Sequence, residues 1–178
     1  MSETILVTGA SAGFGQAICR RLVADGYRVI GSARRIEKLQ ALQEELGEAF
    51  YPLQMDVTDL SQVDHALASL PKAWERVDVL VNNAGLALGL APAYEAEVAD
   101  WLTMIQTNIV GLTYLTRKIL PQMVERNDGY IINLGSTAGT VPYPGANVYG
   151  ASKAFVKQFS LNLRADLAGK KIRVSNIE

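Results

Sequence analysis

Short, unbroken apolar runs alternate along the chain with longer stretches in which apolar residues recur every three or four positions. An unbroken apolar run is typical of a buried strand, whereas the wider spacing is typical of an amphipathic helix. We therefore expect strands at residues 5–7, 27–34, 49–57, 77–85 (with a turn at its end), 130–136 and 171–177. We expect helices at residues 15–25, 35–47, 59–70, 94–126 and 149–168. Gly26 and Gly47 follow the first two helices and indicate where each one ends.

This alternation predicts the fold class. Strands separated by helices form βαβ units, which build a parallel sheet with helices on both faces. Right-handed crossovers favour a Rossmann-like, doubly wound sheet in a three-layer α/β/α arrangement, with strand order 3-2-1-4-5-6. A length of 178 residues suits one domain with a full core. In such sheets ligands bind at the carboxyl ends of the strands, near the point where the strand order reverses.

The turn after the first strand reads TGASAGFG and contains Gly9, Gly13 and Gly15. Gly9 and Gly13 would allow a sharp turn and a close approach of the backbone, and Gly15 would let the helix pack against the sheet. Backbone N–H groups at a helix start suit a pyrophosphate. The alternative is a tight strand-to-helix turn that binds no ligand.

The ends of the second and third strands indicate which nucleotide would bind. A ribose 2′-hydroxyl is usually met by an acid after the second strand, whereas a 2′-phosphate needs a cation. In this chain Arg34 and Arg35 occupy that place and the first acid is Glu37, which favours NADP over NAD. Asp56 and Val57 end the third strand and would meet the adenine. The alternatives are that the arginines are merely solvated and that Asp56 caps a helix.

Polar residues also follow the fourth and fifth strands. The sequence Asn-Asn-Ala-Gly at 82–85 is an ordinary turn, a lining for the adenosine ribose, or a brace between central strands. Ser136 could hold a substrate oxygen or serve as a turn residue. Asn108 lies among apolar residues of a helix, where a buried amide needs partners. It could hold a water that relays protons towards Lys153, or form a hydrogen bond between helices.

Tyr149 and Lys153 are four residues apart on the last expected helix, so their side chains share a face. A nearby ammonium, or a positive nicotinamide ring, favours the phenolate and makes tyrosine an acid–base group. Such pairs also arise by chance. His65 is the only histidine and Cys19 the only cysteine, so we expect neither a histidine-centred triad nor a transition-metal site. We expect Cys19 to be a small buried residue and His65 to lie at the surface or near a helix cap.

Composition narrows the classes of partner. The formal net charge is −1, which argues against general attraction to nucleic acid or to an anionic membrane. No apolar run approaches the roughly 18 residues of a membrane span. The N-terminus lacks the basic and then apolar layout of a signal peptide. We expect a cytoplasmic protein that acts on a small molecule, with no nucleic-acid or membrane partner.

The motifs together resemble the short-chain dehydrogenase/reductase family. TGASAGFG, NNAG, Asn108, Ser136 and YGASK follow one another in the order of the family and span essentially the whole chain. The GFG turn, the arginine pair, NVYGASKAFVKQFSLNLR and RVSNIE are more similar still to its NADP-dependent 3-hydroxy acid dehydrogenases, which also oxidise serine and allo-threonine. The resemblance implies hydride transfer between NADP and a small 3-hydroxy acid or β-hydroxy amino acid. The alternatives are a reductase of ketoacyl or pterin carbonyls and a non-catalytic NADP-binding sensor.

The resemblance also implies a role for each matched position. Tyr149 would be the general acid–base, and Lys153 would assist it and bind the nicotinamide ribose. Ser136 would orient the substrate oxygen, and Asn108 would support a proton relay. The pyrophosphate would be bordered by Gly9, Ser11, Gly13, Phe14 and Gly15. The 2′-phosphate would be held by Arg34 and Arg35, and the adenosine half by Asp56, Val57, Asn83, Ala84 and Gly85. No metal is required.

Members of the family continue past the sixth strand with a Pro-Gly turn, a substrate lid and a seventh strand, whereas this sequence ends at Glu178. We therefore expect residues 1–178 to form a single NADP-binding Rossmann-like domain without the lid and the last strand. The resemblance implies a homotetramer, or a homodimer, built through residues 94–126 and 149–168. Apolar residues there exceed what one core face needs, unless all pack within the monomer; they include Trp101, Leu112, Leu115, Phe155 and Phe159.

Overall fold

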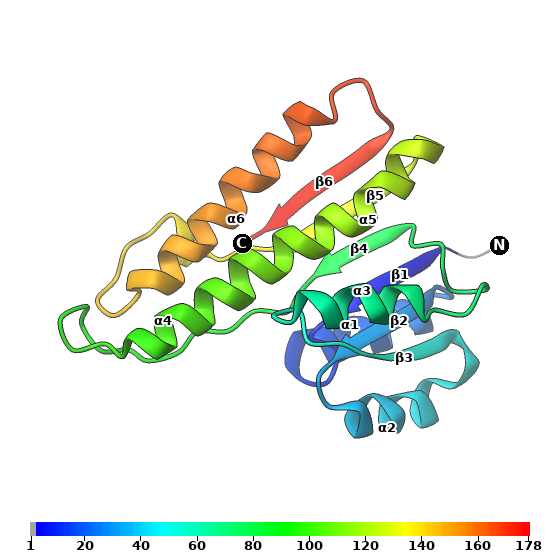
Figure 1. Ribbon diagram of the computed structural model, residues 1–178, viewed down its shortest axis with the longest axis horizontal. Coiled ribbons are helices and arrows are strands. Elements are labelled where there is room, and N and C mark those ends of the chain that lie inside the picture. Colours follow the sequence, from blue (N-terminus) through cyan, green and yellow to red (C-terminus); the bar gives the residue numbers. More distant parts are fainter. Residues whose placement is uncertain (1–2) are drawn as a thin grey trace.

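Six strands form one sheet in the order β3-β2-β1-β4-β5-β6 in the computed structural model, which describes residues 3–178 (Figure 1). Their bounds are β1 Thr4–Thr8, β2 Arg28–Ala33, β3 Phe50–Gln54, β4 Val79–Asn82, β5 Gly129–Leu134 and β6 Ile172–Ile177. Every neighbouring pair is parallel, so the doubly wound fold and the strand order expected from the sequence are confirmed. The order reverses between β1 and β4, and their carboxyl ends mark the ligand-binding edge.

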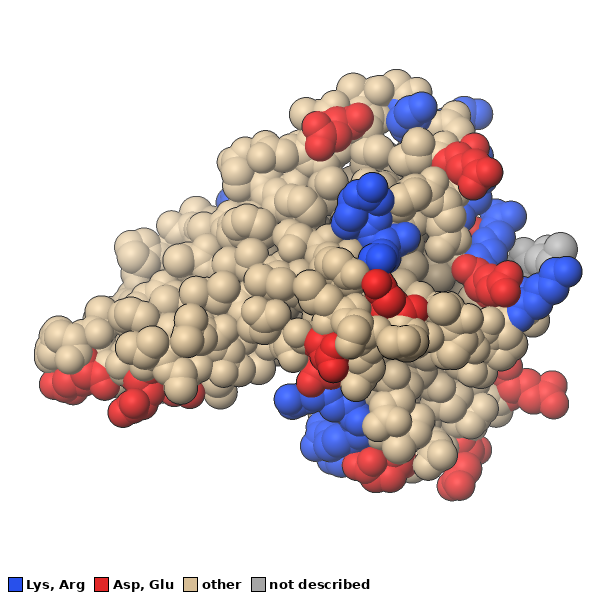
Figure 2. Space-filling view, viewed as in Figure 1, with Lys and Arg blue, Asp and Glu red and all other residues tan. Residues whose placement is uncertain are grey.

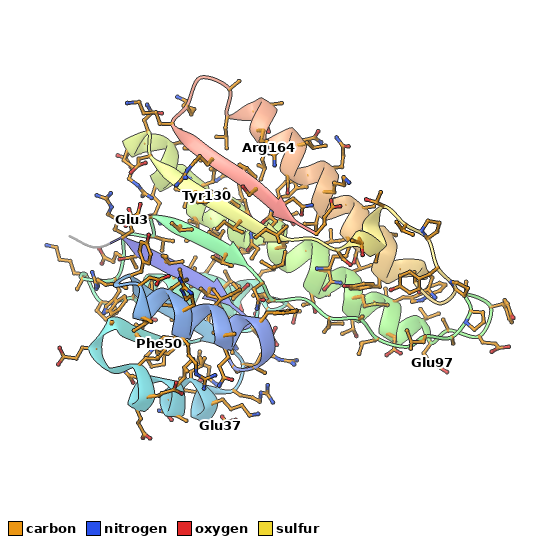
Figure 3. All side chains as sticks on the ribbon, turned by 180° about the vertical axis from the view of Figure 1, so that it is seen from behind. Glu3, Glu37, Phe50, Glu97, Tyr130 and Arg164 are labelled. Carbon is orange, nitrogen blue, oxygen red and sulfur yellow. The ribbon has the colours of Figure 1, made fainter. Side chains whose placement is uncertain are left out.

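Helices cover both faces of the sheet. The α-helices are α1 Gly13–Ala24, α2 Ile36–Leu46, α3 Leu60–Ala68, α4 Val98–Ile105, α5 Leu112–Arg126 and α6 Asn147–Asp166. Short 3₁₀ segments lie at η1 Gly47–Ala49 and η3 Thr137–Gly139, and η2 Gln106–Gly111 is a π-helix that joins α4 to α5. Figure 1 shows α3 and α5 in front of the sheet, and Figure 3, drawn from behind, shows α1 and α2 over the opposite face. Within the described residues, no helix is both long and apolar enough to cross a membrane.

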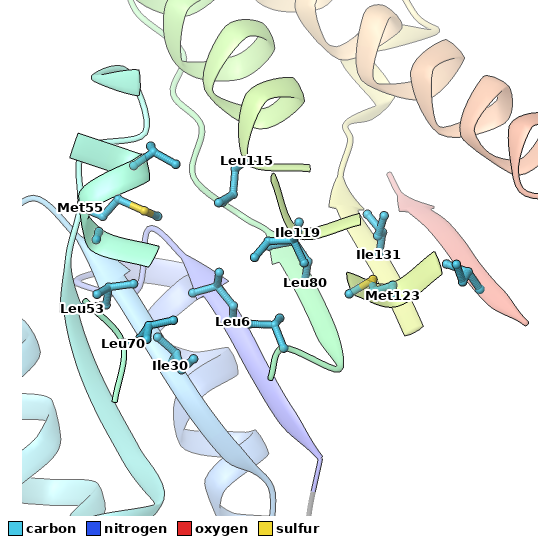
Figure 4. Packing of buried hydrophobic residues seen from close by; sticks show 14 of the residues in the cluster. Leu6, Ile30, Leu53, Met55, Leu70, Leu80, Leu115, Ile119, Met123 and Ile131 are labelled. Atoms are coloured by element: carbon cyan, nitrogen blue, oxygen red, sulfur yellow. The ribbon is translucent and has the colours of Figure 1, made fainter. Parts of the chain in front are cut away.

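Alternation along the strands divides the core into two layers. Leu6, Ile30 and Leu80 point to the face covered by α3, α5 and α6, where they meet Leu115 and Ile119 (Figure 4). The neighbouring strand residues point the other way, towards α1 and α2, and include Ile5, Val7, Val29, Val79 and Val81. Strands buried on both faces account for the unbroken apolar runs of the sequence. Each fully buried side chain of this size contributes about 1.5 to 3 kcal/mol to stability.

Local sequence sets the ends of the first three helices. Gly26 and Gly47 follow α1 and α2 with φ of 88° and 71°, a left-handed conformation that glycine adopts without strain. Asp59 caps α3, because its side chain accepts a hydrogen bond from the backbone N–H of Gln62. Cys19 is buried and His65 is exposed, as expected.

The long helix expected over residues 94–126 is wrong in two respects. Regular helix begins only at Val98, and the π-helical segment η2 interrupts it. The extra residue of a π turn shifts the buried stripe, so Met104 is fully buried and Ile105 is 37% exposed. Leu112 and Leu115, which the sequence places among the surplus apolar residues, are 5% and 0% exposed and belong to the core of this chain.

A buried polar network ties β4 and β5 to two helices. Asn82 Nδ2 donates to Thr116 Oγ1 at 3.0 Å and to Asn133 Oδ1 at 2.9 Å. Asn133 Nδ2 in turn donates to Ser160 Oγ at 2.9 Å. All four residues are at most 3% exposed. Because every polar link has a partner, the network fixes α5 and α6 against the centre of the sheet.

Candidate functional site

A cavity of about 480 Å³ lies along the carboxyl ends of the strands that flank the topological switch. It brings together most of the predicted nucleotide-binding positions, which are Gly9, Ser11, Gly13, Phe14, Arg34, Arg35, Asp56, Val57, Asn83, Ala84 and Gly85. Further lining residues that we did not predict are Ala12, Ser32, Ala33, Met55, Thr58, Leu86, Thr103 and Thr107. Five predicted site residues do not line it, namely Gly15, Asn108, Ser136, Tyr149 and Lys153.

The glycine turn has the form of an anion cradle. Gly9 and Gly13 have φ of 69° and 55°, and a Cβ on Gly13 would meet nothing within 4 Å, so this turn is open on its cavity side. A Cβ on Gly15 would clash with the carbonyl oxygen of Gly9, so Gly15 permits close packing of α1. Among the described residues, no side chain caps the first turn of α1, and this turn contains no acidic residue. Its free N–H groups and the helix dipole therefore suit a pyrophosphate.

The turn after β4 is braced against β1. Thr8 Oγ1 accepts hydrogen bonds from the backbone N–H of Asn83 at 3.0 Å and of Ala84 at 2.9 Å. Asn83 Nδ2 donates to the carbonyl of Thr8 at 2.7 Å. Of the three possibilities open for residues 82–85, bracing of the central strands is what the side chains of Asn82 and Asn83 do.

Two arginines form the cationic end of the cavity. Arg34 and Arg35 are exposed, and neither is in an ion pair with any residue of the described range 3–178. Arg35 Nη2 donates to Ser11 Oγ at 3.2 Å, which draws the guanidinium towards the glycine turn. Gln54 Nε2 donates to the carbonyl of Arg34 at 3.1 Å and holds the end of β2. Two cations without a carboxylate partner are well suited to a phosphate.

Asp56 organises the loop after β3. Its Oδ1 accepts from the backbone N–H of Thr58 at 2.9 Å and from Thr58 Oγ1 at 2.8 Å. Asp59, not Asp56, caps the next helix. Gln106 of η2 donates to the carbonyl of Thr58 at 3.2 Å, and a Cβ on Gly111 would lie 2.7 Å from the carbonyl oxygen of Val57. The loop that would meet an adenine is thus packed directly on the π-helix.

Lys153 and Tyr149 meet beside the other end of the cavity. Lys153 is only 8% exposed, and its Nζ donates to the carbonyl of Leu134 at 2.7 Å. Burial lowers the pKa of the Lys153 ammonium from its ordinary value. Its Nζ lies 5.9 Å from the centre of the ring of half-buried Tyr149. A Cβ on Gly85, which lines the cavity, would lie 3.4 Å from this Nζ, so the two sites adjoin.

Asn108 is buried in η2, and its amide is committed to protein partners. Nδ2 donates to the carbonyl of Leu86 at 2.9 Å and to Ser152 Oγ at 3.0 Å. Oδ1 accepts from the backbone N–H of Leu86 at 3.0 Å. The observed contact is therefore a bridge between the turn after β4 and α6, which corresponds to the helix-linking alternative. One lone pair of Oδ1 remains for a water.

Ser136 caps the start of η3, a segment that packs against α6. Its Oγ accepts from the backbone N–H of Ala138 at 3.1 Å. A Cβ on Gly150 would lie 2.8 Å from the carbonyl oxygen of Ala138, and one on Gly139 would lie 2.7 Å from the backbone nitrogen of Ala154. This close contact of backbones sets Ser136 beside the turn of α6 that carries Tyr149.

Sequence reasoning missed several contributors to the site. Thr103 and Thr107 both line the cavity and are four residues apart, so this polar pair on one face of the expected helix could have been found from the sequence. Thr8 and Ser152 gave no signal, because a single hydroxyl within a motif does not reveal its partners.

The sequence model described as short chain dehydrogenase matches residues 3–178. The chain belongs to the short-chain dehydrogenase family. The resemblance seen in the sequence is thereby confirmed. The chain is an oxidoreductase of the class that acts on hydroxyl groups, as expected.

Two curated relatives are especially similar to this short-chain dehydrogenase. The NADP-dependent 3-hydroxy acid dehydrogenase YdfG of Salmonella typhi is 61% identical over 174 residues, which cover 98% of this chain and 70% of the relative. The serine 3-dehydrogenase of Agrobacterium fabrum is 53% identical over 178 residues, which cover 100% of this chain and 71% of the relative.

Solved structures of serine dehydrogenases are also similar to this chain in backbone and sequence. Serine dehydrogenase from Escherichia coli superposes with a TM-score of 0.97 at 59% identity, over 98% of this chain and 81% of that one. A closed form of serine dehydrogenase complexed with NADP+ gives the same TM-score and identity, over 98% of this chain and 71% of that one. The backbone of this chain is thus similar to that of a structure solved in complex with NADP+.

Proposed function

We propose that this short-chain dehydrogenase transfers hydride between NADP and a small 3-hydroxy acid or β-hydroxy amino acid, such as serine, allo-threonine or 3-hydroxypropionate. One observation carries the proposal: a single cavity runs from two arginines that form no ion pair within residues 3–178 to Gly85, where a Cβ would lie 3.4 Å from the Nζ of the buried Lys153 beside Tyr149. The cationic end suits a 2′-phosphate and the other end supplies acid–base chemistry. The names of the relatives supply the substrate class.

The residues present fit NADP. The glycine turn and the uncapped start of α1 would hold the pyrophosphate, and Arg34 and Arg35 the 2′-phosphate. Asp56, Val57 and the braced turn at Asn83 would flank the adenosine. When bound, NADP accepts or supplies the hydride.

The chain's own residues would move the proton. Ser136 Oγ would donate a hydrogen bond to the reacting substrate oxygen and so fix it near Tyr149. In oxidation the Tyr149 phenolate would take the proton of the substrate hydroxyl, and in reduction the phenol would return it. Lys153, anchored at the carbonyl of Leu134, would keep a positive charge 5.9 Å from the centre of the Tyr149 ring. A water on the free lone pair of Asn108 Oδ1 would connect this group to solvent.

The test compares Tyr149→Phe with Tyr51→Phe. Both variants remove one hydroxyl from a half-buried ring, but Tyr51 packs on Trp74, whereas the ring of Tyr149 has the Nζ of Lys153 5.9 Å from its centre. We expect Tyr149→Phe to lower kcat by about a thousandfold or more while leaving the Kd for NADP within about threefold. Tyr51→Phe should keep the wild-type rate. A Tyr149→Phe enzyme that turns over at a near-wild-type rate would refute the assignment.

We also propose that residues 1–178 form a single domain. We propose further that the protein is cytoplasmic and assembles as a homotetramer or a homodimer. Large apolar side chains are exposed on α4 and just before it, with exposures of 79% for Leu90, 84% for Tyr94 and 61% for both Val98 and Leu102. Figure 2 shows few charged side chains over α4 and the loop before it, apart from acidic ones along the lower edge of this region. Exposed apolar patches of this kind mark contacts between proteins. A monomer measured by light scattering at micromolar protein concentration would refute the proposed oligomer.

A further inference from the structure

Ser152 is a buried hydroxyl one residue before Lys153, and it contacts two groups of the site. It is 1% exposed, and its Oγ donates to the carbonyl oxygen of Tyr149 at 2.7 Å. The same Oγ accepts from Asn108 Nδ2 at 3.0 Å. A hydroxyl has one proton to donate, so these two bonds fix its orientation. The turn of α6 that carries Tyr149 is thereby fastened to η2.

The bond to Asn108 extends to the cavity wall. Both N–H groups of the Asn108 amide are used, one on Ser152 and the other on the carbonyl of Leu86, and its Oδ1 holds the backbone N–H of Leu86. Leu86 lines the cavity directly after Gly85. A continuous chain of hydrogen bonds therefore runs from the cavity wall through Asn108 and Ser152 to the backbone of Tyr149.

We propose that Ser152 is a positioning residue that sets the place of Tyr149 relative to the cofactor cavity. The proposal rests on the proposed function, since it needs Tyr149 to exchange the proton. In a regular helix the carbonyl of Tyr149 also accepts the N–H of position 153. Ser152 therefore acts on the one peptide oxygen that links the Tyr149 and Lys153 turns. Proton transfer requires the donor and acceptor atoms to lie within a narrow range of distances. A small displacement of this turn should therefore lower kcat more than it weakens cofactor or substrate binding.

The same helix contains a matched control. Ser160 is 0% exposed, its Oγ donates to the carbonyl of Val156 at 2.7 Å, and it accepts from Asn133 Nδ2 at 2.9 Å. Ser160 thus has the burial, the bond to an earlier carbonyl and the asparagine donor of Ser152. It differs in lying two turns further along α6, where its partners belong to the sheet network and not to the cavity. A purely structural role predicts the same result at both serines.

The experiment measures NADP+ reduction with L-serine for Ser152→Ala, Ser160→Ala and Ser152→Thr across pH. We expect Ser152→Ala to lower kcat about tenfold and to displace the pH profile of kcat, with KM and the Kd for NADP+ within about twofold. Ser152→Thr keeps the hydroxyl and should restore kcat to within about threefold. Ser160→Ala should lose thermal stability without either kinetic change. Equal kcat values and pH profiles for the two alanine variants would overturn the proposal.

Amide hydrogen exchange separates a failure of this proposal from a failure of the proposed function. If the wild type does not turn over L-serine or 3-hydroxypropionate, the substrate assignment fails, and exchange at the amides of Leu86 and Lys153 then decides the positioning role. We expect exchange at both to be about tenfold faster in Ser152→Ala and unchanged in Ser160→Ala, because the link from Asn108 is lost in the first only. Unchanged exchange at both amides in Ser152→Ala would overturn the proposal.

Discussion

Replacing Arg34 and Arg35 with glutamine, singly and together, removes the two charges at the cationic end of the cavity. Neither guanidinium is in an ion pair within residues 3–178, so no carboxylate partner is left behind. A hydrogen bond to a charged group contributes about 1.5 to 3 kcal/mol, and solvent screening of exposed side chains reduces this to about 1 to 2 kcal/mol. Each single variant should therefore weaken NADP+ binding about five- to thirtyfold, and the double variant about a hundredfold.

The affinity for NAD+ provides the internal comparison, because NAD+ lacks the 2′-phosphate that the arginines are proposed to bind. We expect the Kd for NAD+ to stay within about twofold in all three variants, measured by titration calorimetry at fixed ionic strength. Lys38→Gln is the charge-matched control, since Lys38 lies in the first turn of α2 and does not line the cavity. Raising the salt concentration should reduce the difference in binding affinity between NADP+ and NAD+ in the wild type, but not in the double variant.

Parallel losses of NADP+ and NAD+ affinity would refute this reasoning. That result would mean that the arginines support the pyrophosphate turn, through the contact of Arg35 with Ser11, and do not select the 2′-phosphate. A loss of NADP+ affinity in Lys38→Gln as large as that in Arg35→Gln would refute the reasoning as well. The general positive electrostatic field of this surface would then explain the preference for NADP+.

Two further predictions concern the folded state. Asn133→Ala removes hydrogen bonds to Asn82 and Ser160 at a fully buried position, so the free energy of unfolding in urea should fall by about 2 to 5 kcal/mol, and a loss below about 0.5 kcal/mol would contradict the network. Burial raises the pKa of the Cys19 thiol from 9.0 to about 12, so above pH 9 the unfolded chain releases a proton that the folded chain keeps. The free energy of unfolding should therefore fall with rising pH between about 9 and 12, by up to about 1.4 kcal/mol per pH unit more in the wild type than in Cys19→Ala, and equal slopes would contradict it.

Much of the fold was predictable because its strands are buried on both faces. Runs such as Ile5–Val7 must then be apolar throughout. The glycines at 26 and 47 indicate helix ends because glycine adopts the positive φ that is found there. The positions that line the cavity were predictable for a related reason. Each follows a strand, and parallel strands bring their carboxyl ends to one edge.

The missed features depend on contacts between distant segments. The π turn at Gln106–Gly111 was invisible because residues 101, 105, 108, 112, 115 and 119 still fit a spacing of three and four, although Ile105 is partly exposed. Likewise, nothing near Asn108 in the sequence indicates Leu86 or Ser152, which lie 22 and 44 residues away. These bonds exist only because the sheet brings α6 and the turn after β4 to the same helix.

The most direct test of the proposed activity is absorbance at 340 nm when the enzyme is given NADP+ or NAD+ with L-serine, L-allo-threonine or 3-hydroxypropionate. We predict reduction with all three compounds, and at least about tenfold faster with NADP+ than with NAD+ at equal concentration. No reduction with any of them would contradict the proposed substrate class and direct attention to ketoacyl and pterin carbonyls. Equal rates with the two nucleotides would contradict the role given to Arg34 and Arg35.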